Sequence, residues 1–270
     1  MSTTTTFTPA ELALYETDGY YFARGLFSKE ETDLLLKVGK GDKAISEGDS
    51  ALVRQDAQGN LTKLALRNEL SDDLYSAIVR SRRIVDRMEQ ILGGEAYHYH
   101  HKMMLKEPRV GGAWEWHQDY GYWYNNGCLF PYMASCLIAV DRATKENGCL
   151  QVIRGSHHMG RVEHGTQAGG QVGADMERVE KALERMELVY CEMEPGDALF
   201  FHGNTLHRSD MNASEYPRWS LICCYNAARN DPYKKHHHPN YSYLDKLDDN
   251  EVLGVGQREW NRMQSHMQPA

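Results

Sequence analysis

Three pairs of polar residues, each with one residue between its two members, could carry chemistry in this chain. The pairs are His117 with Asp119, His207 with Ser209, and Arg218 with Ser220. Residues i and i+2 of a β-strand point to the same face, so each pair can direct two functional groups into one cavity. Two imidazoles and one carboxylate form the ligand set of a non-haem Fe(II) oxygenase, which leaves coordination positions open. The spacing therefore predicts an iron site made by His117, Asp119 and His207.

Arg218 follows His207 by eleven residues, a position that suits an acidic cosubstrate beside the metal. The cosubstrate 2-oxoglutarate chelates a metal through its keto oxygen and the adjacent carboxylate. Its far carboxylate needs a planar, permanently charged partner, which arginine provides better than lysine. Ser209 and Ser220 can add hydroxyl groups to the same site. These residues predict an oxygenase that depends on Fe(II), 2-oxoglutarate and O₂.

The composition is that of an ordinary globular protein and excludes several other classes. The chain has 270 residues, a formal net charge of −8 and a pI of about 5.9, which argues against a general nucleic-acid or anionic-membrane surface. No apolar run approaches the ~20 residues needed to cross a bilayer. The N-terminus lacks the basic and apolar regions of a signal peptide. Six cysteines without disulfide-like spacing predict reduced thiols and a cytoplasmic protein.

The first third of the chain is predicted to be mainly helical. Capping boxes at Thr8…Glu11 and Ser28…Glu31 predict helices that run to about residues 18 and 38, with a short strand over 20–24 between them. Residues 41–68 are polar and rich in turn formers, which favours a loop or a hairpin. Ser71 is predicted to cap one long amphipathic helix that ends at the paired glycines 93 and 94.

The pattern then changes to short strands separated by turns. Strands are expected near 96–106, 113–117, 134–141, 149–153, 188–194, 198–201, 206–211 and 218–227. Such a series predicts a mainly β fold, a double-stranded β-helix of the jelly-roll or cupin-like type, with an N-terminal helical layer. Residues 175–186 are expected to form a charged helical insertion. The whole chain is read as a single domain, with a mainly helical part over 1–94, a jelly-roll core over 95–229 and an irregular C-terminal cover over 230–270.

Several motifs in the second half occur together in one known family. They are Lys106-Glu107-Pro108, His117-Gln118-Asp119, Glu146-Asn147-Gly148, Pro195-Gly196-Asp197 and the series His207…Ser209…Arg218. From about residue 98 to residue 227 the chain resembles the phytanoyl-CoA dioxygenase family, in particular its small domain-containing members. The resemblance implies the same three iron ligands, with Arg218 and Ser209 as cosubstrate contacts. It also implies hydroxylation with release of succinate and CO₂, because related halogenases have a small residue at the position of Asp119.

The resemblance further places two cosubstrate-lining positions at Lys102 and Leu137. Relatives often carry an apolar methionine and a tryptophan there, so this chain departs from the family pattern. Lys102, with other basic residues at the expected cavity border, favours a small polar, anionic metabolite as the substrate. Candidate substrate contacts are Tyr120, Trp123, Asn147, Arg154 and His157. His98 and His100 are expected to share one face of a strand, and the tract His236-His237-His238 is expected to be a solvated loop.

Three other interpretations are compatible with these residues. The first is a non-catalytic, cupin-like protein that binds a metal, which would form no succinate from 2-oxoglutarate. The second is a zinc hydrolase that activates water with the same three ligands, although hydrolysis has no use for Arg218. The third stays within the oxygenase class and takes an acyl-CoA ester as its substrate.

Overall fold

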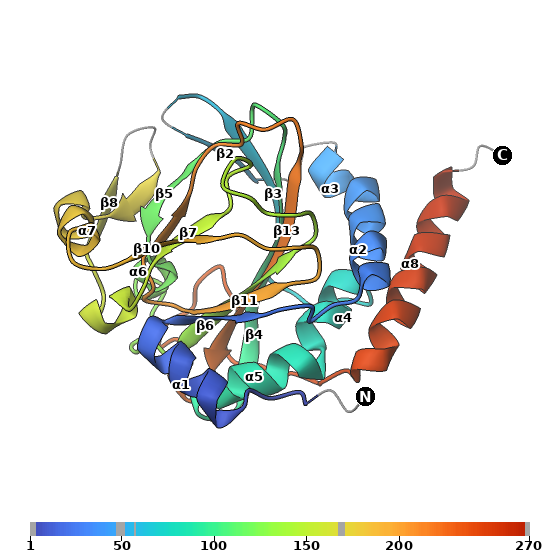
Figure 1. The fold of residues 1–270 in the computed structure, drawn as a ribbon. Helices are drawn as coiled ribbons and strands as arrows, with labels where there is room; N and C mark the ends of the chain where they lie inside the picture. Colours follow the sequence, from blue (N-terminus) through green and yellow to red (C-terminus); the bar gives the residue numbers. More distant parts are fainter. Residues whose placement is uncertain (1–3, 47–51, 57, 167–170, 268–270) are drawn as a thin grey trace.

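Two facing β-sheets form the centre of the molecule in a computed structural model that describes residues 4–46, 52–56, 58–166 and 171–267 (Figure 1). The large sheet has the order β1 (Tyr20–Ala23), β11 (Ala198–His202), β6 (Met133–Ala139), β13 (Arg218–Ala227), β4 (Ala96–Lys106), β3 (Leu61–Arg67) and β2 (Leu52–Gln55). The small sheet has the order β10 (Leu188–Cys191), β7 (Leu150–Ile153), β12 (His207–Ser209) and β5 (Trp114–His117). Every pairing in both sheets is antiparallel. The predicted mainly β, jelly-roll type of fold is confirmed.

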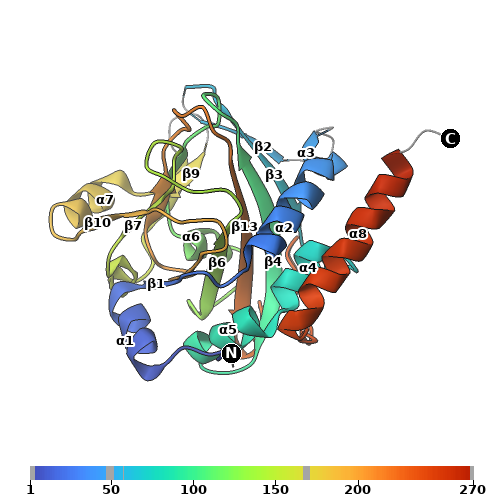
Figure 2. The same cartoon turned by 45° about the vertical axis from the view of Figure 1, so that its right-hand side comes forward.

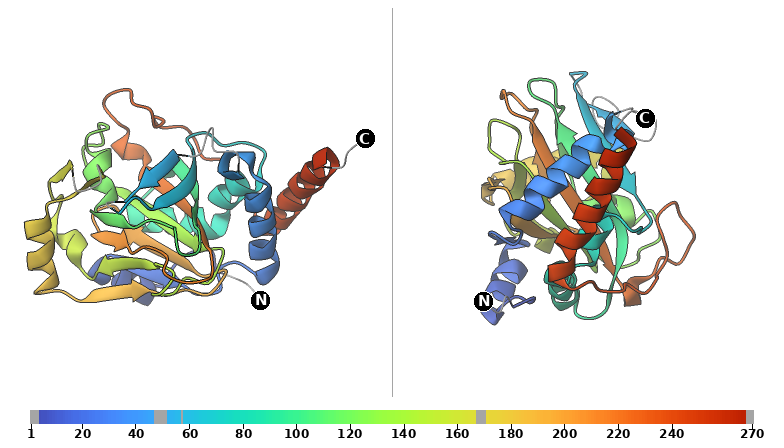
Figure 3. Two further views of the ribbon diagram at one scale, coloured as in Figure 1. Left: turned by 90° about the horizontal axis from the view of Figure 1, so that it is seen from above. Right: turned by 90° about the vertical axis from the view of Figure 1, so that its right-hand side faces the viewer.

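Helices cover the outer face of the large sheet. They are α2 (Lys29–Gly41), α3 (Lys43–Ser46), α4 (Leu74–Arg80), α5 (Arg82–Leu92) and α8 (Val252–Met267), and α1 (Pro9–Asp18) precedes β1. Figure 2 shows α2 and α4 lying against the sheet, and Figure 3 shows α8 beside α2. At the opposite end of the molecule lie α7 (Met176–Leu183) and the hairpin of β8 (His164–Thr166) and β9 (Val172–Ala174). No helix in the described residues is both long and apolar enough to span a bilayer.

The buried hydrophobic residues form two main cores, one on each face of the large sheet. The outer core packs helix residues such as Leu35, Ile78 and Val85 against strand residues such as Leu221. The inner core lies between the sheets and contains aromatic and sulfur-bearing side chains, among them Trp123 and Cys224. Because β-strand side chains alternate between the faces, β13 and β4 serve both cores. The functional side chains described below all face the inner core.

Two of the predicted helical starts agree with the structure, and the third differs. The capping boxes of α1 and α2 form as predicted. The hydroxyl of Thr8 accepts a hydrogen bond from the backbone amide of Glu11, and that of Ser28 accepts one from the backbone amide of Glu31. The predicted long helix after Ser71 is wrong, because the chain breaks at Ser81 into α4 and α5, and α4 is capped by Asp73 instead. A distant part of the chain stabilises this break. The backbone of Leu247 hydrogen-bonds with the backbones of Arg80 and Arg82, the two residues that flank Ser81.

An irregular C-terminal cover was expected over residues 230–270, and this prediction is wrong for residues 252–267. Residues 230–247 carry little regular structure, but Val252–Met267 forms α8. Val252, Gly256, Trp260 and Met263 recur at three- and four-residue steps, which is the helical signal that the sequence prediction overlooked. Gly256 allows a close approach, because a Cβ at this position would meet the side chains of Leu34 and Leu74. The hairpin of β8 and β9 was also not predicted, because its strands are only three residues long.

The pairing of β4 with β13 sets the positions of the functional residues along the inner core. The register places Lys106 opposite Arg218, Lys102 opposite Ile222 and His100 opposite Cys224. An irregularity between Cys224 and Tyr225 inserts one extra residue into β4. The expectation that His98 and His100 share a face is therefore wrong. His98 binds the ring of His101, while His100 lies against Trp123 in the inner core.

Candidate metal centre and cosubstrate site

Three side chains meet where β5 ends and its neighbour β12 begins. His117 ends β5 and pairs in register with His207 at the start of β12, and Asp119 begins the short helix α6 (Asp119–Trp123). All three residues are buried, and one possible ligand atom from each lies within 4.8 Å of the others. The Nε2 atoms of both histidines lie 3.8 Å from Oδ1 of Asp119. The structure thus brings together the three residues that the sequence predicts as metal ligands.

Both histidine rings are oriented by the backbone of their own strands. Nδ1 of His117 donates to the carbonyl of Glu115 at 2.7 Å, and Nδ1 of His207 donates to the carbonyl of Thr205 at 2.9 Å. Because a carbonyl can only accept, each Nδ1 carries the proton and each Nε2 lone pair is directed at the third ligand. Burial lowers the pKa of His117 well below its usual value and also lowers that of His207. Two neutral imidazoles and one carboxylate fit Fe(II), the ion that this donor set prefers in oxygenases.

The carboxylate of Asp119 is held by a residue that sequence reasoning missed. Ser135, on β6, donates from its Oγ to Oδ2 of Asp119 at 2.8 Å, and Sγ of Cys224 lies 3.3 Å from the same Oγ. This leaves Oδ1, the oxygen nearer both imidazoles, available for a metal. No local sequence signal marks Ser135, because its relation to Asp119 depends on the pairing of β6 with β13.

Replacement of Ser135 by alanine should weaken metal binding without removing a ligand. Outer hydrogen-bond partners of metal ligands typically contribute about 10–100-fold to affinity or activity, so Ser135→Ala should lower iron affinity by that factor. Titration of the metal-free protein with Mn(II), followed by calorimetry, measures the change. Ser135→Thr keeps the hydroxyl and should bind close to wild type; equal affinities in Ser135→Ala and wild type would refute the role.

The residue between the first two ligands also has a structural task that the sequence did not reveal. Gln118 is fully buried, and its side-chain amide donates to the carbonyls of Gly160 and Asn204 while its oxygen accepts the amide of Val162. Its backbone amide donates to Nε2 of His164. Gln118 therefore fixes the turn between His117 and Asp119 against two distant loops.

A group of cationic and hydroxyl side chains lies at the other end of β12. Nζ of Lys106 donates to Oγ of Ser209 at 2.8 Å and also binds the carbonyl of Asp210. Arg218 lies opposite Lys106 in the sheet, and its Nη1 donates to the carbonyl of Gly148 at 2.6 Å. Nε of Arg218 and Oγ of Ser220 are buried and have no hydrogen-bond partner among the described residues.

Two adjacent cations are thus buried without a carboxylate. Within the described part of the chain neither Lys106 nor Arg218 forms an ion pair, and burial lowers the pKa of Arg218 to about 10. Burial and the neighbouring guanidinium also lower the pKa of Lys106 well below its usual value. An uncompensated buried charge is strongly destabilising, so this arrangement fits an anionic ligand. A dicarboxylate whose far end lies here matches both the charge and the unpartnered donors.

Gly148 orients Arg218 through its carbonyl, and its conformation requires glycine. Its φ of +75° lies in the left-handed region, and a Cβ would overlap the carbonyl oxygen of Asp210. Gly148→Ala should lower the free energy of unfolding by about 1–3 kcal/mol and weaken 2-oxoglutarate binding together with it. Urea denaturation with and without 2-oxoglutarate measures both effects. Gly165→Ala is the matched control, because nothing lies within 4 Å of its added Cβ. An equal loss of stability and of 2-oxoglutarate binding in the two variants would show that Gly148 has no special role.

The other two predicted cosubstrate residues lie on the strands between these groups. Leu137, on β6, is buried in the inner core, in register with Ile222 of β13. Lys102 is opposite the same Ile222 on β4, and its Nζ lies 5.6 Å from the ring centre of Trp114. The charge of Lys102 contributes to the lowered pKa values of both His117 and His207, so it faces the metal ligands.

The five predicted substrate contacts are not brought together. The hydroxyl of Tyr120 donates to the carbonyl of Cys128, and the side chain of Asn147 closes a turn with Thr144 and Arg142. Arg154 pairs with Asp18 and Glu187, and Nε2 of His157 is bonded to the carbonyl of Glu16. Their polar groups are engaged in structural contacts away from the metal ligands. Tyr120 and Trp123 both lie in the inner core, and the ring of Trp123 packs beside His100.

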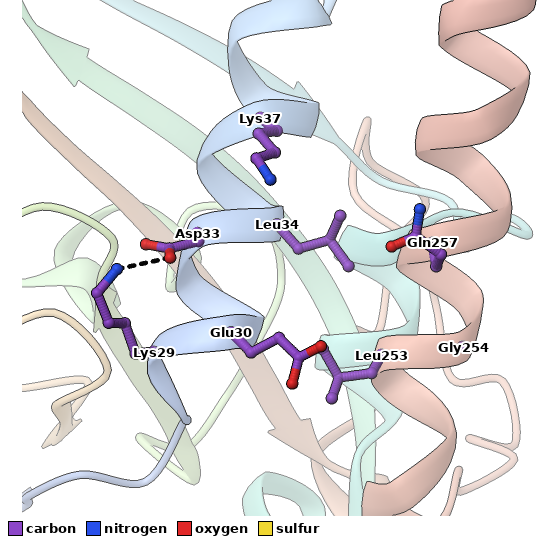
Figure 4. Close-up of a pocket in the computed structure, with 8 residues that line it drawn as sticks. All are labelled: Lys29, Glu30, Asp33, Leu34, Lys37, Leu253, Gly254 and Gln257. Carbon is purple, nitrogen blue, oxygen red and sulfur yellow. Dashed lines mark hydrogen bonds and ion pairs between the residues drawn. The ribbon is translucent and has the colours of Figure 1, made fainter.

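A surface groove lies on the other side of the molecule, between α2 and α8 (Figure 4). Leu34 and Leu253 line it together with charged residues, including the ion pair of Lys29 with Asp33 at 2.6 Å. It contains none of the residues predicted for the site. The helices and the large sheet separate this groove from the inner core.

Comparison with known proteins decides the family. The sequence model of the family Phytanoyl-CoA dioxygenase (PhyH) matches residues 15–220, which include the three predicted metal ligands and Arg218. The chain belongs to the phytanoyl-CoA dioxygenase family. This membership confirms the predicted enzyme class, an oxygenase that depends on Fe(II), 2-oxoglutarate and O₂.

Other members of the phytanoyl-CoA dioxygenase family are similar over most of the chain. An L-proline trans-4-hydroxylase of Streptomyces griseoviridis is 33% identical over 176 residues, which are 60% of this chain and 66% of that protein, slightly less than two thirds. An ectoine dioxygenase of Bordetella parapertussis is 26% identical over 230 residues, which are 80% of this chain and 74% of that protein. The fold is similar to EctD from S. alaskensis, solved with 2-oxoglutarate and 5-hydroxyectoine, with a TM-score of 0.76, 21% identity, and coverage of 92% and 89% of the two chains.

Proposed function

We propose that this protein hydroxylates a small polar metabolite that carries an anionic group, with 2-oxoglutarate converted to succinate and CO₂. The observation that carries the proposal is the convergence of the three ligand side chains beside two buried cations that have no carboxylate partner among the described residues. The relatives' names support a small substrate, because L-proline and ectoine are both compact polar molecules.

The residues have distinct roles in the proposed reaction. His117, Asp119 and His207 would hold the iron, and the bound iron with 2-oxoglutarate supplies the oxidising chemistry. Arg218 would bind the far carboxylate of 2-oxoglutarate in a planar fork. Lys106 acts on the same carboxylate indirectly: an ammonium can only donate, so Oγ of Ser209 accepts from Lys106 and its own proton is free for the cosubstrate. Ser220 would add a second hydroxyl, and Lys102 with Leu137 would line the space near the metal.

Exclusion of water is the other contribution of the chain. The ligand histidines, Ser135 and the inner-core residues are buried between the sheets, so charges there interact more strongly than in water. Turnover of 2-oxoglutarate without substrate should accordingly be slow. The surrounding protein supplies geometry and placement.

The experiment combines two product measurements. Purified protein is supplied with Fe(II), ascorbate and 2-oxoglutarate, and L-proline, ectoine and further small carboxylates are screened as substrates. Succinate and the hydroxylated product should appear in equal amounts for at least one compound. Absence of any succinate would favour the non-catalytic metal-binding protein, and turnover of long acyl-CoA esters alone would refute the proposed substrate class.

Two broader proposals accompany this function. We propose that residues 1–270 act as one domain, since helices from the N-terminal and C-terminal parts, α2, α4 and α8, pack together over the large sheet. We also propose a cytoplasmic location, which the six buried cysteines, all unbridged, support. The partner required by the proposed reaction is the small-molecule substrate.

A further inference from the structure

His100 is a buried polar residue that the functions described so far do not use. It lies on β4 with 5% of its surface exposed, and its Nδ1 is buried without a hydrogen-bond partner among the described residues. The large majority of buried polar side-chain atoms in proteins have such a partner, so each exception needs an explanation. The ring faces the inner core, where its centre lies 5.9 Å from that of Trp123.

The sheet register places His100 at the level of the metal ligands. His100 is opposite Cys224 on β13, Cys224 is opposite Ser135 on β6, and Ser135 binds Asp119. Arg218 lies six residues before Cys224 on the same strand, which is about 20 Å along it. His100 is therefore level with Asp119 along the sheet, whereas Arg218 lies far from that level. A cosubstrate that extends from the metal toward Arg218 would leave the side of His100 to the primary substrate.

A second histidine, from the C-terminal part of the chain, packs on His100. The ring of His238 stacks on that of His100, with 4.6 Å between centroids and 20° between planes, and it also contacts Tyr99 at 4.7 Å. Nδ1 of His238 is paired with Oδ1 of Asn68 at 2.8 Å, and Nδ2 of Asn68 donates to the carbonyl of His237 at 2.9 Å. The expectation of a solvated tract holds for His236 and His237, which are exposed, but His238 is half-buried.

The charges around the two rings favour an anion. Lys102 is two residues from His100 on the same face of β4, and its charge reaches both His100 and His238. The neighbours that act electrostatically on these two rings are cations or other histidines, with no carboxylate among them. Burial and these neighbours lower the pKa of His100 and His238 far below the usual value, so both rings are neutral hydrogen-bonding groups.

We propose that His100, with the ammonium of Lys102 beside it, binds the anionic group of the primary substrate, while His238, whose Nδ1–H is already donated to Asn68, holds the ring of His100 in place by stacking on it. Nδ1–H of His100 would donate to a carboxylate or phosphonate oxygen, and residues 236–238 would form one wall of the substrate site. This inference rests on the proposed function and deepens it, because it names the groups that select an anionic substrate. It also gives a task to Trp123, a predicted substrate contact in the inner core whose ring packs edge-on against His100.

Anion binding can be measured without catalysis. Protein loaded with Zn(II) and 2-oxoglutarate is titrated calorimetrically with three probes, acetate, L-proline and methylphosphonate, and with the neutral amide acetamide. At least one of the first three probes, each of which carries a carboxylate or phosphonate group, should bind saturably while acetamide does not. A hydrogen bond to a charged group implies that His100→Leu weakens the binding by at least about 10-fold, with 2-oxoglutarate affinity unchanged. His238→Ala removes the ring that stacks on His100 and should weaken the binding by a smaller factor. His100→Asn keeps a donor and should retain part of the affinity.

The matched control is His236→Ala, in the same tract but exposed, which should bind every probe as the wild type does. Absence of saturable binding of acetate, L-proline and methylphosphonate alike, wild-type affinity in His100→Leu, or equal binding of acetamide would each overturn the inference. Succinate formation by the wild type separates this failure from failure of the proposed function. If succinate forms and the variants bind as the wild type, only the substrate site is misassigned.

Discussion

His207→Ala and Asp119→Ala should each abolish turnover, with a loss greater than the about 100-fold that removal of an outer partner of a metal ligand can cause. The reason is that each supplies one of three ligand atoms that lie within 4.8 Å of one another, and no other His, Cys, Asp or Glu of the described residues completes such a group. The metal-free variants should remain folded. Binding at 100 times Kd contributes about 2.7 kcal/mol to stability, so Mn(II) should raise the Tm of the wild type and not that of the variants.

His158→Ala is the control for this measurement. His158 is an exposed histidine outside the site, and its replacement should leave both the Mn(II)-dependent Tm shift and turnover unchanged. A full Tm shift in His207→Ala and in Asp119→Ala would show that the metal binds elsewhere. A variant that retains the shift and loses turnover would separate metal binding from the later steps.

Arg218→Ala should raise the KM for 2-oxoglutarate by at least about 30-fold and leave the KM for the primary substrate nearly unchanged. Truncation of one partner of a buried, hydrogen-bonded charge pair typically costs about 2–5 kcal/mol, and Arg218 is buried with an unpartnered Nε. Arg218→Lys should be intermediate, since an ammonium keeps the charge but cannot form a planar fork. Steady-state kinetics with each of the two substrates varied in turn measure both values.

Arg142→Ala is the matched control, because Arg142 is exposed and pairs with Glu194 on the surface. The control should not change either KM. An equal rise in both KM values for Arg218→Ala would show that its role is not limited to the cosubstrate. No change in either value would remove Arg218 from the site altogether.

Much of the fold follows from local patterns in the sequence. The strands over 96–106 and 218–227 have the predicted bounds, because turn signals delimit them on the sequence. The break at Ser81 was not predictable in this way, since no glycine or proline marks it and its partner Leu247 is distant in the sequence. Local structure was therefore predicted correctly where the residues of a segment determine it by themselves. It was missed where contacts with a distant segment determine it.

The same distinction applies to the site. His117, Asp119, His207 and Arg218 could be predicted because their spacing and chemistry are visible along the chain. Ser135 and His100 act through strands that are paired only in the folded molecule, so no local signal distinguishes them, and the contact of Lys106 with Ser209 also becomes visible only there. The proposed substrate contacts at Asn147, Arg154 and His157 were inferred from residue type alone. In the structure their polar atoms are bonded to turns and to α1.

The segment that carries His238 lies beyond residue 220, where the family match ends, and around His238 itself it is held by Asn68, the residue that follows β3. Evolution can therefore alter this segment while the iron chemistry encoded upstream stays intact. Homologues that share the core but differ in their last fifty residues would then diverge in what they oxidise. Grafting such tails onto one common catalytic core offers a direct way to redirect these enzymes.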